Sequence, residues 1–135
     1  METMTQDHDI TVFYVTAKSF PDGIMEAHQK LHALVPPSID RKYFGISRPE
    51  NGVIVYKAAA EEMSPGEAKK FNCDTLVLKK GQYICLTIRD YAKNNQSIDK
   101  AFKKLLAHHD LDPQGYCVEW YFNDKDVICM VRLKK

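Results

Sequence analysis

One acidic residue, Glu119, interrupts an aromatic, strand-like segment that covers residues 116–122. An ionised carboxylate is costly to bury among aromatic rings without a partner. In the simplest interpretation, Glu119 points to solvent or pairs with Arg132. In the second, it is the negative floor of an aromatic cleft, where ring faces also attract organic cations. In the third, it is a general acid or base whose pKa is raised by removal from water.

The position of Glu119 depends on how its strand pairs with the next one. Residues 116–122 and 127–133 predict a hairpin, because both are rich in β-branched, aromatic and apolar residues. If the facing ends of these strands pair, Glu119 lies opposite Met130, since opposite residues share a face. Tyr121 then shares that face as well. We therefore expect Met130 and Tyr121 beside the carboxylate.

The remaining strands indicate why a cleft should exist. Strands with one wet face alternate apolar and polar residues, but residues 53–56 and 83–86 are apolar on both faces. Two helices cover only one face of a sheet. A ligand cleft, a dimer interface or a folded-back linker must shelter the other face, and we favour the cleft. Tyr43, Tyr56 and Tyr83 are candidates to line it.

The order of elements repeats along the chain. Each half predicts the order strand, helix, strand, strand. The expected elements of the first half are residues 10–16, 19–35, 42–47 and 53–60. Those of the second half are extended chain at 75–78 and 83–90, then residues 97–109, 116–122 and 127–133. The hydrophobic spacing thus predicts an α+β fold, a curved antiparallel sheet with two main helices on one face and a ligand cleft between the halves. We expect one domain over residues 1–135, with residues 1–9 flexible and 61–72 linking the halves.

Composition excludes several classes of function. The chain has 135 residues and a formal charge of +1, which gives no electrostatic footprint for direct nucleic-acid binding. It contains no signal-like or membrane-length apolar run, so we expect a cytoplasmic protein with no membrane contact. We expect its four cysteines to be reduced, without metal or cofactor. His28 and His32 lie four apart on a predicted helix, and we interpret them as a solvated helix face.

The sequence also resembles the GyrI-like small-molecule-binding family, whose domain is the effector-binding module of some drug-sensing transcription activators. The resemblance rests on Lys-Tyr-Phe-Gly-Ile-Ser at 42–47, Tyr-Lys-Ala-Ala at 56–59, Lys-Gly-Gln-Tyr at 80–83 and Gly-Tyr-Cys-Val-Glu-Trp-Tyr at 115–121. It implies that Glu119 faces the cleft and contacts ligand. It further implies that Tyr121, Trp120, Tyr43 and Tyr56 form the walls. No DNA-binding segment accompanies these motifs, so direct transcriptional regulation is not expected.

Three functions therefore remain open. The leading hypothesis is a binding module, monomeric or homodimeric, for an amphipathic aromatic or cationic small molecule. The second, implied by some stand-alone relatives, is a hydrolase of reactive cyclopropane-type xenobiotics with Glu119 as the catalytic residue. The third is a protein-interaction domain that inhibits a partner such as DNA gyrase.

Overall fold

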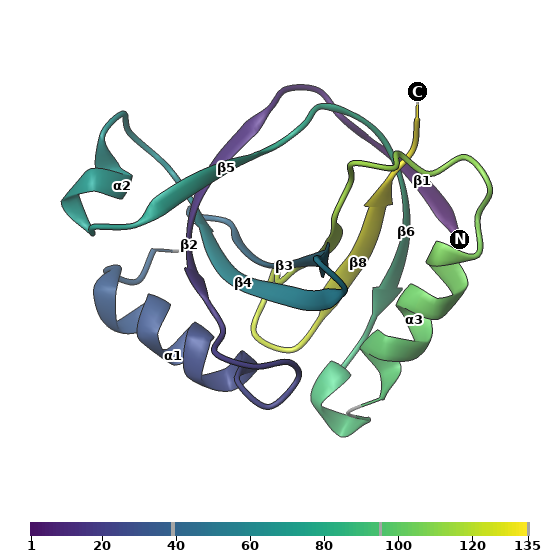
Figure 1. Ribbon diagram of the computed structural model, residues 1–135, viewed down its shortest axis with the longest axis horizontal. Coiled ribbons are helices and arrows are strands. Elements are labelled where there is room, and N and C mark those ends of the chain that lie inside the picture. Colours follow the sequence, from purple (N-terminus) through teal and green to yellow (C-terminus); the bar gives the residue numbers. More distant parts are fainter. Residues whose placement is uncertain (39, 95, 135) are drawn as a thin grey trace.

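The computed structural model describes residues 1–38, 40–94 and 96–134, and within them one antiparallel sheet of eight strands curls into a half-barrel (Figure 1). The strands are β1 (Glu2–Gln6), β2 (Ile10–Thr16), β3 (Tyr43–Glu50), β4 (Val53–Glu61), β5 (Asp74–Leu78), β6 (Gly81–Ile88), β7 (Cys117–Trp120) and β8 (Val127–Arg132). The helices are α1 (Ile24–Leu34), α2 (Glu67–Lys70) and α3 (Ser97–Leu106), together with the 3₁₀ helix η1 (Tyr91–Lys93). The order across the sheet is β1-β6-β8-β7-β3-β4-β2-β5.

The expected duplication is confirmed, with one extra strand before each unit. The first half runs β2-α1-β3-β4 and the second β6-α3-β7-β8. The two halves meet where β3 pairs with β7. Each extra strand crosses to the other half, since β1 pairs with β6 and β5 pairs with β2. Five residue pairs join Glu2–Gln6 to β6, where the polar sequence had indicated a flexible segment.

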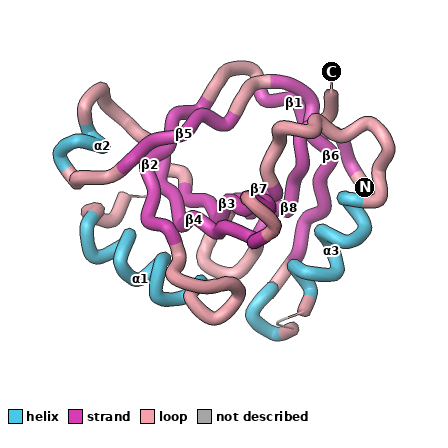
Figure 2. Tube along the Cα trace, in the orientation of Figure 1, coloured by secondary structure: helices cyan, strands magenta, loops and turns pink. Residues whose placement is uncertain are grey.

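Helices α1 and α3 lie on the outer face of the curl, on either side of its base (Figure 2). Helix α1 packs on β2 and β4, and α3 packs on β6 and β8. Leu31 of α1 is fully buried with Phe13, next to the small side chains Ala58 and Ala60, which let the helix approach the sheet. Burying a side chain such as Leu31 contributes about 1.5–3 kcal/mol.

The inner face of the curl carries a second apolar cluster. Its members include Val12, Phe44, Ile46, Val118 and Met130, which come from four different strands. The sheet shelters this face by curling over it. The groove described below instead lies on the helix-bearing face, so the second apolar face is not the cleft that the sequence had suggested.

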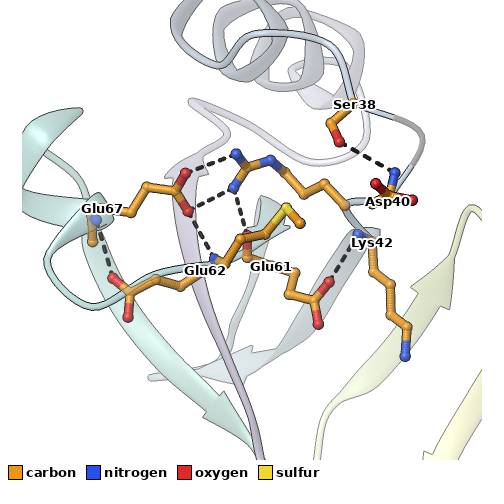
Figure 3. A network of polar contacts seen from close by, with 9 residues as sticks. Ser38, Asp40, Lys42, Glu61, Glu62 and Glu67 are labelled. Carbon is orange, nitrogen blue, oxygen red and sulfur yellow. Dashed lines mark hydrogen bonds and ion pairs between the residues drawn. The ribbon is translucent and has the colours of Figure 1, made fainter.

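Residues 61–72 contain helix α2 and are tied to the start of β3 by a polar network (Figure 3). The Arg41 guanidinium donates to both carboxylate oxygens of Glu67, at 2.7 and 2.8 Å, and to the Glu61 carbonyl at 2.8 Å. Glu62 accepts the Ala68 backbone N–H at 3.1 Å. These contacts hold the connection between the halves against the sheet.

No helix among the described residues is both long enough and apolar enough to cross a membrane.

Candidate functional site

Glu119 lies near the middle of the sheet. Strand β7 runs between β3 and β8, where Glu119 is opposite Gly45 on one side and Cys129 on the other. Its side chain therefore lies on the helix-bearing face. Gly45 makes the room, because a Cβ atom built there would collide with the Tyr56 hydroxyl and lie 2.5 Å from Glu119 Oε1.

Three side chains connect to the carboxyl group through hydrogen bonds. The Tyr56 hydroxyl donates to Glu119 Oε1 at 2.9 Å, and the Tyr121 hydroxyl donates to the same oxygen at 2.5 Å. His28 Nε2 lies 2.8 Å from the Tyr56 hydroxyl. Because that hydroxyl gives its one proton to Glu119, the His28 Nε2–H must be the donor in this contact. Helix α1 and strands β4 and β7 thus converge on one carboxyl group.

The electrostatics of the cluster follow from its burial. Glu119 is only 8% exposed. Burial raises the pKa of its carboxyl group, while the hydroxyls of Tyr121 and Tyr56 oppose part of that rise. Burial, assisted by His32, lowers the pKa of His28 to about 4, so the imidazole is neutral at pH 7. Burial, followed by the proximity of Glu119, raises the pKa values of both tyrosines, which therefore remain hydroxyl donors.

An open groove of about 1000 Å³ lies above this cluster. One wall comes from α1 and the loop before it, and the other from η1 and the β7–β8 turn. The lining residues are Pro21, Asp22, Ile24, Met25, His28, His32, Ser38, Arg41, Tyr43, Tyr91, Tyr121, Phe122, Asn123 and Asp124. A volume of this size suits a drug-sized ligand.

The groove has an aromatic lower part and apolar lips. The ring of Tyr121 lies edge-on to those of His28 and Tyr91, with centroids 5.5 Å apart in each case. The rings of His32 and Tyr43 are 4.9 Å apart. Met25 at the rim is 72% exposed.

Asp126 fixes the wall formed by the β7–β8 turn. It accepts the Asp90 backbone N–H at 2.9 Å, the Arg89 guanidinium at 3.1 Å and the Asn123 amide at 3.1 Å. The Asn123 side-chain oxygen in turn accepts the Asp126 backbone N–H at 2.8 Å. The aromatic residues of this wall are therefore held on an anchored turn.

Of the residues proposed from sequence, Tyr43 and Tyr121 line the groove, and Tyr56 lies beneath it in contact with Glu119. Trp120, Tyr83 and Met130 belong to the apolar cluster on the inner face, away from Glu119. The structure therefore brings four of the seven together.

The expected hairpin register is wrong by one residue. Glu119 lies opposite Cys129, and Met130 lies opposite Val118. The turn is longer than expected because strand β7 ends at Trp120, and the hydrogen bonds of Asn123 and Asp126 shape the loop. Arg132 is also not the partner of Glu119, since its guanidinium binds Asp112 at 2.9 Å and the Lys80 carbonyl at 2.8 and 3.0 Å.

His28 is the residue that sequence reasoning missed. It is not part of a solvated helix face, because it contacts Tyr56 and lines the groove. The sequence did contain an indication that His28 faces the sheet. Ala27 and Leu31 are the buried residues of α1, and His28 lies next to the first and three residues before the second. A polar residue at the edge of a buried stripe points along the interface between helix and sheet.

Potential metal ligands gather elsewhere. Over residues 1–38, 40–94 and 96–134, one group of three brings its ligand atoms within 4.8 Å of one another, namely His108, His109 and Asp110. His108 Nδ1 accepts the Asp110 backbone N–H at 3.1 Å. A neutral His108 ring then carries its proton on Nε2, where a metal ion would need a lone pair.

The fold and the groove together define a curled, duplicated α+β domain. No protein-family model matches the sequence, and no curated protein matches it either. Solved structures with this fold include an integron cassette protein from the mobile metagenome of Vibrio cholerae. That protein has a TM-score of 0.70 and 11% identity, and the match covers 98% of this chain and 94% of that one.

Two further structures carry printed descriptions that bear on function. SAV2435 bound to tetraphenylphosphonium has a TM-score of 0.69 and 12% identity, and covers 99% of this chain and 94% of its own. A putative bacterial transcription regulation protein from Staphylococcus aureus MU50 has a TM-score of 0.65 and 12% identity, with coverage of 100% and 99%. These likenesses establish the shared fold.

Proposed function

We propose that this protein is a small-molecule-binding domain that takes amphipathic aromatic cations into the groove, with Glu119 as their counter-charge. The observation that carries the proposal is one buried carboxyl group beneath an aromatic groove. A carboxylate in a site largely removed from water attracts a cation more strongly than an exposed one does.

The walls suit the rest of such a ligand. Faces of Tyr rings attract cations as well as apolar groups, and Tyr43, Tyr91 and Tyr121 all line the groove. Exposed Met25 and Phe122 at the lips offer adaptable apolar contact. The tetraphenylphosphonium bound by SAV2435, a protein of the same fold, is a ligand of this chemical class.

The test is calorimetric titration of the protein with tetraphenylphosphonium. The Glu119→Gln variant keeps the size of the side chain and an oxygen that can accept from both tyrosines. We expect it to lose about 10–100-fold in affinity, which corresponds to a charge-assisted contact of about 1.5–3 kcal/mol. Glu26→Gln, on the exposed face of α1, is the matched control and should bind like the wild type. Equal affinity in Glu119→Gln and wild type would contradict the role of the carboxylate.

A second candidate, the hydrolase, is favoured by one observation. Burial raises the pKa of Glu119, as a general acid requires. Incubation with reactive cyclopropane-type electrophiles, followed by mass spectrometry of the compounds, separates the two functions. Compound consumed by the wild type and left intact by Glu119→Gln supports the enzyme, and compound recovered unchanged from both supports binding alone.

A further inference from the structure

We propose that binding at this site is an exchange, in which the empty groove holds Glu119 as a neutral acid and the arriving cation displaces its proton. This inference rests on the proposed function and adds a chemical coupling to it. The coupling makes the affinity for a cation depend on pH even when the ligand itself has no titratable group.

The first support is the lack of a lysine or arginine partner for Glu119 in the part of the chain that the structure describes. Among the described residues, neither an arginine nor a lysine forms an ion pair with this carboxyl group. The groove-lining Arg41 is already paired with Glu67 through both of its terminal nitrogens. A buried carboxyl group with no cation beside it keeps its proton to a higher pH than an exposed one does.

The second support comes from the titratable groups on the elements packed around Glu119. They are His28 and His32 on α1, Tyr56 on β4, Tyr121 and Tyr91 on the second wall, Cys117 on β7 and Cys129 on β8. Burial and His32 keep His28 neutral at pH 7 by lowering its pKa. Burial raises the pKa values of Cys117 and Cys129 to about 11 and about 12, so both are neutral thiols. The rim adds Asp22 and Asp124, which attract a cation but cannot neutralise a carboxylate.

The third support is that the two carboxyl oxygens of Glu119 differ in their hydrogen bonds. Both tyrosine hydroxyls donate to Oε1. Within the described part of the chain, no hydrogen bond is made to Oε2. The acidic proton therefore belongs on Oε2. When the cation binds, the O–H bond at Oε2 breaks, its electron pair stays on the carboxylate and the proton passes to water or buffer.

The two tyrosine hydroxyls also stabilise the ionised form of Glu119, so the carboxyl group can lose its proton and regain it. After the proton leaves, Tyr56 and Tyr121 still donate to Oε1 and stabilise the negative charge. Their effect on the pKa opposes that of burial. The site is thus prepared for the ionised form although the empty groove favours the neutral one.

The decisive experiment is calorimetric titration with tetraphenylphosphonium, whose charge is permanent, so any proton released comes from the protein. Titrations in two buffers of different ionisation enthalpy give the number of protons released, and a pH series from 5 to 9 gives the affinity. We expect up to one proton released per cation at low pH. Affinity should rise about tenfold per pH unit and level off above the pKa of the carboxyl group.

Variants assign the proton to its source. Glu119→Gln should release none and show no dependence on pH, whereas His28→Gln should retain both effects. An infrared difference spectrum of the empty wild type minus Glu119→Gln should show the carbonyl band of a protonated carboxyl group, lost when tetraphenylphosphonium is added. This spectrum tests the exchange by a second signal if the calorimetric heats are small.

The outcomes separate the two proposals. An affinity that does not vary with pH, without proton release, overturns the exchange; if Glu119→Gln still binds more weakly, the proposed function stands. Proton release that persists in Glu119→Gln and disappears in His28→Gln also overturns the exchange as stated. The absence of binding by the wild type at every pH overturns both.

Discussion

The hydroxyl group of Tyr56 reaches across strand β3 to donate to Glu119 Oε1 at 2.9 Å. Tyr56 lies on β4 and Glu119 on β7, and β3 runs between these two strands. The contact passes over Gly45, which has no side chain to block it. It joins the two halves of the duplicated fold directly at the candidate site.

The first prediction concerns Gly45. A Cβ atom at this position meets the Tyr56 hydroxyl and Glu119 Oε1, so Gly45→Ala forces both side chains to move. We expect a loss of about 1–3 kcal/mol in the free energy of unfolding, typical of overpacking, and weaker binding of tetraphenylphosphonium. Urea denaturation and calorimetry measure these effects. Ser47→Ala in the same strand is the control and should change stability by less than about 0.5 kcal/mol.

The second prediction concerns the tyrosine donors. Tyr56→Phe and Tyr121→Phe each remove a hydrogen bond that favours the ionised form of Glu119, so the pKa of the carboxyl group rises further. The pH at which cation affinity levels off should therefore move upward in both variants. Each variant should also lose about 1 kcal/mol of stability.

Tyr83→Phe is the matched control for these substitutions. It removes a tyrosine hydroxyl that donates to the Lys79 carbonyl at 2.6 Å, on the face away from Glu119. A pH profile that shifts equally in Tyr83→Phe would show that the effect does not come through Glu119.

The third prediction is the pH dependence of stability at Glu119. Its folded pKa lies above the unfolded value of 4.5, so between the two the folded state binds more protons than the unfolded state. The contribution of Glu119 to the free energy of unfolding therefore falls as pH rises from about 4.5 through the folded pKa. Glu119→Gln should remove that fall. The free energy of unfolding of the variant minus that of wild type, measured by denaturation without ligand, should increase with pH; a constant difference would argue against a raised pKa.

The fourth prediction concerns His28, whose shift has the opposite consequence. Its folded pKa of about 4 lies below the unfolded value of 6.5, so the unfolded state binds more protons between these values. Stability should therefore fall as pH drops from 6.5 to about 4, by at most roughly 3 kcal/mol. His28→Gln keeps an N–H donor for Tyr56 and should lose this dependence. His109→Gln, at an exposed position, should leave the wild-type dependence unchanged.

The fifth prediction concerns the network that holds residues 61–72. The side chains of Arg41 and Glu67 are only 7% and 13% exposed. Glu67→Gln leaves the buried guanidinium without its counter-charge and should cost about 3 kcal/mol. Because Arg41 lowers the pKa of Glu67 to about 2, this stabilisation is present above pH 4.5 and is lost as pH falls toward 2. The double variant Arg41→Met/Glu67→Leu should recover much of the stability lost in Glu67→Gln. Denaturation at pH 7 measures the free energy of unfolding of each variant. A double variant that is less stable than Glu67→Gln would contradict this prediction.

Local patterns were sufficient for most of the fold. The apolar segments of β2, β4 and β8 and the helical spacing of α1 and α3 predicted the duplicated order that the structure confirms. Strand β1 was missed because Glu2–Gln6 is polar, and its pairing with β6 is a long-range contact that no local pattern encodes. The curvature of the sheet was expected from the sequence and is confirmed, because segments that are apolar on both faces need a sheet whose second face is also sheltered.

The candidate site was predictable where it depended on strand parity alone. Glu119 and Tyr121 are two residues apart and share a face in any register. Met130 was misplaced because the register depends on hydrogen bonds within the turn, such as those of Asn123 and Asp126. The contact of Tyr56 with Glu119 also required the strand order, which places β3 and Gly45 between them.

Strands β1 and β5 each pair with a strand of the other half. The same exchange occurs between the two subunits of a strand-swapped dimer, but here both halves belong to one polypeptide. In a chain of half the length, the first strand would have no strand to pair with, and one edge of the remaining sheet would be unpaired. Two such chains would each supply the strand that the other lacks. Joining the copies removes the dependence of assembly on protein concentration. It also frees the two halves to diverge, so that one can supply the carboxylate of Glu119 and the other the empty space at Gly45.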